Sequence, residues 1–97
     1  MLEIKYKKLK LLGGNYMKIK NIEYYNFKGT KEVFRISLED NNISRIQFTC
    51  KIYGTERMLF ETYVSYTNGR HMTYNHTRTP KKYNKMFNEY IKNYPAE

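Results

Sequence analysis

The sequence predicts an α+β fold: an antiparallel four- to five-stranded meander with one C-terminal amphipathic helix packed on one sheet face. Two observations carry this prediction. Apolar and polar residues alternate with a period of two over much of residues 17–75, and short turn sequences interrupt the alternation. Beyond residue 79 the apolar spacing becomes that of a helix. Because the turns are short, successive strands are expected to pair as antiparallel neighbours.

The first three predicted strands cover residues 17–27, 32–38 and 43–53. In the first, the alternation slips between Ile19 and Ile22, which indicates a β-bulge. Turns are predicted at residues 28–30 and 39–42, which are rich in Gly, Asp and Asn. The third strand has the clearest alternation. Its apolar face would hold Ile46, Phe48, Cys50 and Ile52, and its other face Arg45, Gln47, Thr49, Lys51 and Tyr53.

Two further strands are predicted at residues 57–66 and 70–75. Gly54-Thr55 and Asn68-Gly69 supply the turns, and the second is a strong hairpin signal. The alternation in residues 57–66 would turn Met58, Phe60, Val64 and Tyr66 toward one face and Leu59, Glu61, Tyr63 and Ser65 toward the other.

The C-terminal segment predicts a helix of about four turns. Thr79 suits the N-cap position, Pro80 suits the first helical position, and Pro95 would end the helix. An apolar stripe follows the i, i+3, i+4 pattern at Tyr83, Met86, Phe87, Tyr90, Ile91 and Tyr94.

The stripe needs an apolar surface to pack on, and one face of the predicted sheet supplies it. The opposite sheet face would stay uncovered. This layout is similar in outline to small single-stranded-DNA-binding folds of the Whirly and transcriptional-coactivator type, an analogy at the level of the fold. The sheet residues expected under the helix are Phe34, Ile36, Leu38, Ile46, Phe48, Ile52, Phe60 and Val64.

Residues 17–97 are expected to form a single domain, since the whole chain has only 97 residues. Residues 1–16 have two interpretations of equal weight. They are a translated leader if Met17 is the native start, because Gly13-Gly14 can be encoded by a ribosome-binding sequence at a suitable distance. Alternatively, they form a genuine N-terminal strand or helix joined by a Gly-Gly turn.

Composition restricts the function classes. Lys and Arg number 18 against nine acidic residues, a formal net charge of +9, so polyanions or acidic protein surfaces are the expected partners. A single cysteine excludes an internal disulfide, and no motif for a cofactor or a metal is visible. The apolar runs are short, so no membrane contact is expected and the default location is cytoplasmic. An exposed edge strand would also permit a homodimer.

The uncovered sheet face is the first candidate for binding. Cations neutralise phosphates and tyrosine rings stack on unpaired bases, so single-stranded DNA or RNA is the favoured ligand. The same residue types are also ordinary on a solvated sheet face. The candidates on this face are Arg35, Arg45, Lys51, Tyr53, Arg57 and Tyr63, joined by Tyr74, Lys18 and Lys20.

A second basic cluster spans residues 70–92. Lysines in the first turn of a helix oppose its macrodipole, and such an exception can mark a functional site. A solvated helix face is the alternative. The candidates in this cluster are Arg70, Arg78, Lys81, Lys82 and Lys85, with Lys92 beyond them.

Three functions remain open. The first is a small non-enzymatic nucleic-acid-binding protein, and the AT-rich codon usage that the composition suggests favours a phage or mobile-element source. The second is a phage or mobile-element inhibitor that binds a host nucleic-acid enzyme or nucleoprotein, such as an anti-CRISPR or other anti-defence protein. The third is a toxin-like ribonuclease, in which His71, His76 or a tyrosine would transfer protons and an arginine would bind the phosphate. Its signal is the weakest of the three. Cys50 falls on an apolar strand face and is expected to be a buried structural thiol.

Overall fold

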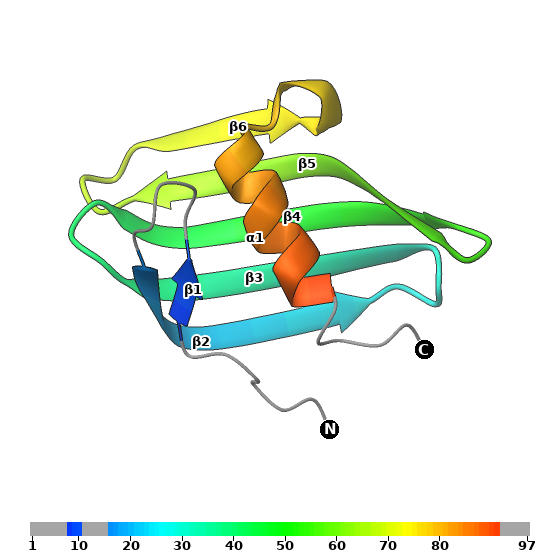
Figure 1. The fold of residues 1–97 in the computed structure, drawn as a ribbon, viewed down its shortest axis with the longest axis horizontal. Coiled ribbons are helices and arrows are strands. Elements are labelled where there is room, and N and C mark those ends of the chain that lie inside the picture. Colours follow the sequence, from blue (N-terminus) through cyan, green and yellow to red (C-terminus); the bar gives the residue numbers. More distant parts are fainter. Residues whose placement is uncertain (1–7, 11–15, 92–97) are drawn as a thin grey trace.

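The fold is one antiparallel sheet with a helix across one of its faces (Figure 1). The computed structural model describes residues 8–10 and 16–91. Its strands lie in sequential order, and the predicted meander with a C-terminal helix is confirmed. The elements are β1 (Lys8–Lys10), β2 (Tyr16–Asn26), β3 (Lys31–Glu39), β4 (Ile43–Tyr53), β5 (Glu56–Tyr66), β6 (His71–Asn75), the short 3-10 helix η1 (His76–Arg78) and α1 (Lys81–Ile91).

Strand β1 adds a short sixth strand at one edge of the predicted meander. It pairs with the start of β2, Lys8 opposite Lys18 and Lys10 opposite Tyr16. Residues 1–7 and 11–15 lie outside the described residues, so the native start at Met17 stays a prediction.

The bulge predicted in β2 is confirmed. The register with β3 shifts between Ile19 and Asn21, which leaves Lys20 as the additional residue. Beyond it, Ile22 lies opposite Ile36 in β3. The bulge therefore allows apolar residues on both sides of it to face the helix.

Strand β5 also contains a bulge, which the alternation did not predict. Thr49 lies opposite Glu61 but its neighbour Cys50 lies opposite Leu59, so Phe60 is the additional residue. Leu59 is therefore buried, whereas Met58 and Phe60 are exposed. The prediction that Met58 and Phe60 face the core is wrong, because the extra residue reverses the face of every residue on the N-terminal side of it.

The predicted start of α1 also needs a correction. The backbone N–H of Asn84 donates to the carbonyl of Pro80, 3.2 Å away, so Pro80 accepts the first helical hydrogen bond. The Thr79 hydroxyl does not cap the helix. It donates instead to the carbonyl of Asn75 at 2.7 Å and ties the helix to the end of β6. The predicted end at Pro95 and the stripe residue Tyr94 lie outside the described residues.

The core lies between α1 and the sheet. Tyr83, Met86, Phe87 and Tyr90 are the buried residues of the helix, as its apolar stripe predicted. The Phe87 ring lies 5.4 Å from that of Phe48 and 6.0 Å from that of Phe34, measured between centroids. The described helices include none that is long and apolar enough to cross a membrane. The sheet residues of the core are Ile19, Phe34, Ile36, Leu38, Ile43, Ile46, Phe48, Cys50, Leu59 and Val64.

Candidate functional site

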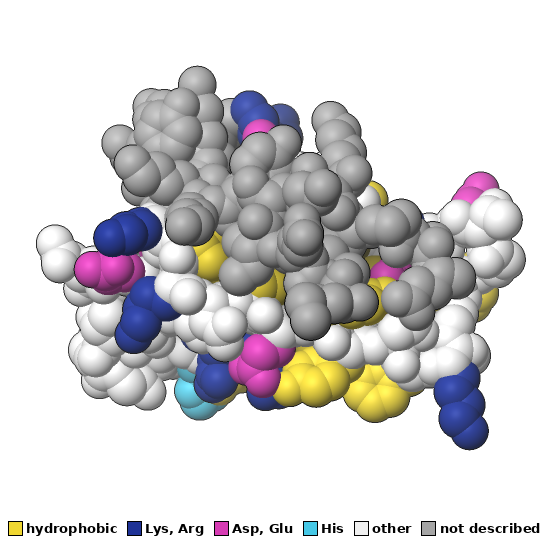
Figure 2. All heavy atoms as spheres, turned by 90° about the horizontal axis from the view of Figure 1, so that it is seen from below, with side chains coloured by type: hydrophobic (Ala, Val, Ile, Leu, Met, Phe, Trp, Pro, Cys, Tyr) yellow, Lys and Arg dark blue, Asp and Glu magenta, His cyan; other side chains and the backbone are white. Residues whose placement is uncertain are grey.

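The sheet face opposite α1, here called the open face, is not covered by any helix of the described chain (Figure 1). Figure 2 views the molecule from below Figure 1, and its lower margin is the side turned away from the reader in Figure 1. Hydrophobic side chains lie along this margin beside basic, acidic and histidine side chains. Five apolar residues here are exposed: Tyr25 near the end of β2, Phe27 just after it, Tyr53 at the end of β4, Met58 in the first half of β5, and Phe60 at the bulge beside it.

Three cations lie over three exposed rings on the open face. The Lys31 ammonium is 4.6 Å from the centroid of Phe27, and the Lys51 ammonium is 5.6 Å from that of Tyr53. The Arg35 guanidinium lies 5.6 Å from the centroid of Tyr25. Cation–ring contacts at exposed sites contribute only ~0.5–1 kcal/mol each, so they orient these side chains more than they stabilise the fold.

Lys31 and Lys51 are direct neighbours across β3 and β4. Like charges opposite one another on a sheet are destabilising. In the described part of the chain neither lysine takes part in an ion pair, whereas Lys18 pairs with Glu39 and Arg35 lies 4.0 Å from Glu23. The register therefore places two lysines without an acidic partner next to each other on the open face.

Arg45 and Arg35, two further predicted cations of the open face, differ in how many contacts they make with neighbouring side chains. Arg45 is exposed and lies between Ser37 and Ser65 in the register, with no acidic neighbour directly across. The Arg35 Nε donates to Gln47 Oε1 at 3.0 Å, so part of this guanidinium is held within the sheet. Of Arg35, Arg45 and Lys51, the last two therefore have the side chains that are freer to bind a ligand.

Tyr63 is also on the open face, where its ring stacks on His71 with centroids 5.2 Å apart and 21° between the planes. His71 begins β6 and His76 follows its end. At ~3.4 Å per residue along the strand, the two histidines are too far apart to act on one bond. A ribonuclease mechanism that uses both histidines together is therefore not supported by this geometry.

Two predicted residues of the open face lie on the other side of the sheet. Arg57 is opposite Ile52, and Tyr74 is opposite the buried Thr62. Placing them on the open face is wrong. For Arg57 the reason is the bulge at Phe60, and for Tyr74 it is the register of β6, which brings the Tyr74 ring within 6.0 Å of Tyr83 in α1.

Arg57 instead completes a buried polar cluster beside the core. Its Nε donates to Glu32 Oε1 at 2.5 Å, and the Glu32 side chain is wholly buried. The Tyr24 hydroxyl donates to the other carboxylate oxygen, and Asn26 Nδ2 donates to the Tyr24 oxygen at 3.1 Å. Sequence reasoning missed this cluster, although one signal was present: Glu32 shares the strand face of Phe34 and so needed a buried cationic partner.

Cys50 lies next to the same carboxylate, with its Sγ 3.8 Å from Glu32 Oε1. Burial, followed by the nearby Glu32 charge, raises the pKa of the thiol to about 12. The thiol is therefore protonated at neutral pH and cannot act as a nucleophile there. The prediction of a buried thiol is confirmed.

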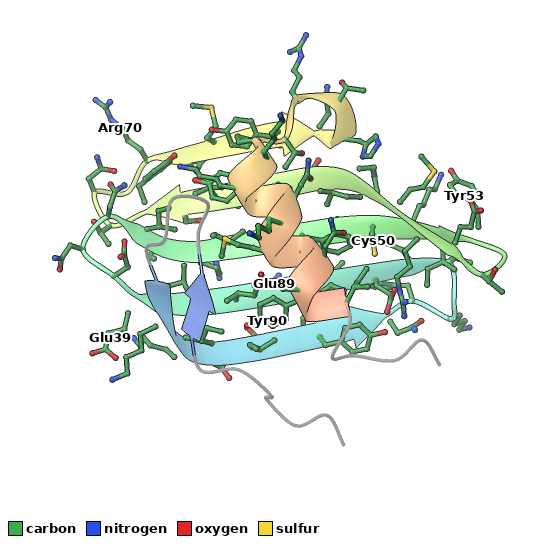
Figure 3. All side chains as sticks on the ribbon, in the orientation of Figure 1. Glu39, Cys50, Tyr53, Arg70, Glu89 and Tyr90 are labelled. Atoms are coloured by element: carbon green, nitrogen blue, oxygen red, sulfur yellow. The ribbon has the colours of Figure 1, made fainter. Side chains whose placement is uncertain are left out.

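The second basic cluster is divided by the fold. Arg70 lies in the β5–β6 turn, whereas η1 follows the opposite end of β6 and leads into α1, which crosses the middle of the sheet (Figure 3). Arg78, Lys81, Lys82 and Lys85 remain together around the start of α1, and all four are exposed. The Lys82 ammonium lies 4.9 Å from the centroid of Tyr83. The cluster predicted over residues 70–92 is therefore split. Arg70 lies apart, and most of the charge is around the start of α1.

No group of three His, Cys, Asp or Glu side chains that could hold a metal ion is found within residues 8–10 and 16–91. No family model matches the chain, and neither a curated protein nor a solved structure matches it significantly.

Proposed function

We propose that this protein is a small, non-enzymatic nucleic-acid-binding protein that holds single-stranded DNA or RNA on its open face. The observation that carries the proposal is the adjacent pair Lys31 and Lys51, flanked by the exposed rings of Phe27 and Tyr53. A phosphate between the two ammonium groups relieves their repulsion. The rings beside them offer flat surfaces to unpaired bases.

The exposure of the rings supports a single strand over a duplex as the ligand. The Tyr53 side chain is 54% exposed and Phe27 is 49% exposed. Bases in a duplex are stacked on one another and cannot stack on these rings without unpairing. Arg45, farther along β4, extends the basic surface toward the other end of the sheet. A strand that crosses the face would therefore contact rings at one end and Arg45 near the other.

The experiment is a fluorescence-anisotropy titration of labelled 12-nucleotide DNA, RNA and duplex DNA at 50 and 150 mM salt. Binding should be tighter for a single strand than for the duplex and should persist at the higher salt. Arg45→Glu with Lys51→Glu should weaken it at least tenfold, whereas the charge-conserving Arg45→Lys with Lys51→Arg should weaken it much less. Equal affinities for the three ligands, lost at 150 mM salt, would contradict the proposal.

Two variants of Tyr53 test whether its ring stacks on a base. Tyr53→Ala removes the ring and should reduce single-strand affinity roughly fivefold or more, because one stacked base contributes ~1–3 kcal/mol. Tyr53→Phe keeps the ring and should bind almost as the unaltered protein does. Equal losses in the two variants would mean that the hydroxyl, and not stacking, is what matters.

A second candidate function is supported by Met58 and Phe60. These apolar side chains are 43% and 38% exposed, and Met58 is the direct neighbour of Lys51 across β4 and β5. Exposed apolar residues beside cations suit a protein interface. The corresponding function is an inhibitor from a phage or mobile element that covers an acidic surface on a host nucleic-acid enzyme. Failure of every nucleic-acid titration, together with a defined complex in pull-downs from the host, would favour it.

A further inference from the structure

A cavity of about 320 Å³, lined by both polar and apolar side chains, opens on the helix side of the sheet. It lies between the first half of β5, the short helix η1 and α1. Its volume is at the lower end of the range of small-molecule sites, ~300–1,000 Å³. The residues that define its chemistry are Arg57, Leu59, His76, Asn84, Phe87 and Asn88.

The walls of the cavity offer donors and acceptors that the protein itself does not fully use. Asn84 Nδ2 donates to the carbonyl of Thr79 at 3.3 Å, which leaves its Oδ1 as an acceptor. Asn88 is exposed one turn farther along α1. Arg57 Nη2 is buried without a hydrogen-bond partner. Buried polar groups normally have a partner, so this nitrogen is an unsatisfied group on a residue that lines the cavity.

The charge of the cavity favours a neutral ligand. The Arg57 guanidinium is balanced by the buried Glu32 carboxylate at 2.5 Å, and no other lining residue is a Lys, Arg, Asp or Glu. A phosphate would therefore gain little here. A planar heterocycle with donors and acceptors along its edge matches two amides, and an Asn amide in particular complements the donor–acceptor edge of adenine. Phe87 and Leu59 supply the apolar wall that such a ring also needs.

Two lysines lie on the same face of α1 as the asparagines of the cavity. Lys81, Asn84, Lys85 and Asn88 follow one another at intervals of three, one and three residues, which places them along one helix face. Arg78 belongs to η1 beside His76. A base held by Asn84 and Asn88 would therefore have its phosphates within reach of Lys81 and Lys85.

We propose that this cavity holds one unpaired nucleobase, with adenine preferred, of a strand bound by the protein. This deepens the proposed function and rests on it. Met58 lines the cavity and also neighbours Lys51 of the open face across the sheet. In the described chain β6 pairs only with residues 61–65 of β5, so the outer edge of residues 56–60 is not covered by a strand. The short helix η1 also packs against β5, so a single strand that connects the open face to the cavity would pass around both η1 and this edge.

The test follows backbone and side-chain amide signals by NMR while the 5′-monophosphates of adenosine, guanosine, cytidine and uridine are added separately to 10 mM. Adenosine monophosphate should shift the signals of His76, Asn84 and Asn88 more than the other three nucleotides do. Asn84→Ala with Asn88→Ala should reduce its affinity at least fivefold. Asn41→Ala, which removes an exposed amide from the distant β3–β4 turn, should leave the affinity unchanged.

The outcomes separate this inference from the proposed function. If the oligonucleotides bind but no nucleotide shifts the cavity signals, the base pocket is refuted and the open-face proposal stands. If adenosine monophosphate binds in the cavity while no oligonucleotide binds, the pocket is supported as a nucleotide site and the proposed function fails. If the double variant loses no affinity, or if the Asn41 variant loses as much, the assignment of the amides is refuted.

Discussion

Glu32→Gln is the perturbation that tests the buried cluster most directly. The change keeps the shape of the side chain and removes its charge. Glu32 is wholly buried, its Oε1 accepts from Arg57 Nε at 2.5 Å, and the Arg57 side chain is only 16% exposed. The variant therefore leaves a guanidinium without its counter-ion in a site that water hardly reaches.

The expected loss is about 3 kcal/mol. Breaking a buried ion pair from one side costs ~3–5 kcal/mol. The lower end of that range applies because Gln keeps one acceptor oxygen and because the exposed sixth of Arg57 admits some solvent. A domain of this size has a total stability of ~5–15 kcal/mol, so the loss is a large fraction of it. With an m-value of ~1.5 kcal/mol per molar urea, the unfolding midpoint should fall by ~2 M.

The assay is urea unfolding followed by circular dichroism, with two further variants as controls. Glu39→Gln breaks the exposed pair with Lys18, where both side chains are more than 60% exposed, and should cost less than ~1 kcal/mol. Glu32→Leu with Arg57→Met removes both charges and should recover most of the stability lost by Glu32→Gln. If Glu32→Gln costs no more than Glu39→Gln, the cluster does not hold the fold and our reasoning is refuted.

Three more predictions concern the core, a thiol and a turn. Phe48→Ala should cost ~3–5 kcal/mol in the same assay, because its wholly buried ring packs on Phe87; a loss below ~0.5 kcal/mol would contradict the face assigned to β4. The raised pKa of Cys50 means that the unfolded thiol ionises first as pH rises above 9, so stability should fall between pH 9 and about 12, and Cys50→Ala should show a shallower fall. Backbone N–H groups of Ile43 and Asn42 lower the pKa of Asp40, so its contribution should be present above the ordinary carboxyl pKa and be lost as pH falls below it. Asp40→Asn should remove that part of the acid sensitivity, and an unchanged acid profile would contradict it.

The faces of β3 and β4 and the buried stripe of α1 followed from periodicity, because each of these segments has an unbroken repeat. The bulge in β2 was also predictable, since the slip between Ile19 and Ile22 is visible as a break in the apolar pattern. In β5 no such break is visible: Met58, Phe60 and Leu59 are all apolar, so either face of the strand could have been the buried one. Only the pairing with β4 decides that Leu59 is buried and Phe60 is exposed.

The residues of the candidate site also fall into those whose face the sequence predicted correctly and those whose face it did not. Arg45, Lys51 and Tyr53 belong to the strand with the clearest alternation, so the sequence placed them on the open face correctly. Arg57 and Tyr74 were misplaced, because their faces depend on a bulge and on the register of a short edge strand.

By itself the sequence determined the order of the strands, the helix and its buried stripe, because hydrophobic periodicity and turn chemistry are local properties. Tertiary structure alone decided that Lys31 faces Lys51, that Glu32 meets Arg57, and that Asn84, Asn88 and His76 surround one cavity. These contacts join residues from different elements. Their existence depends on register and packing angle, which a one-residue bulge can change without leaving a mark on the local pattern.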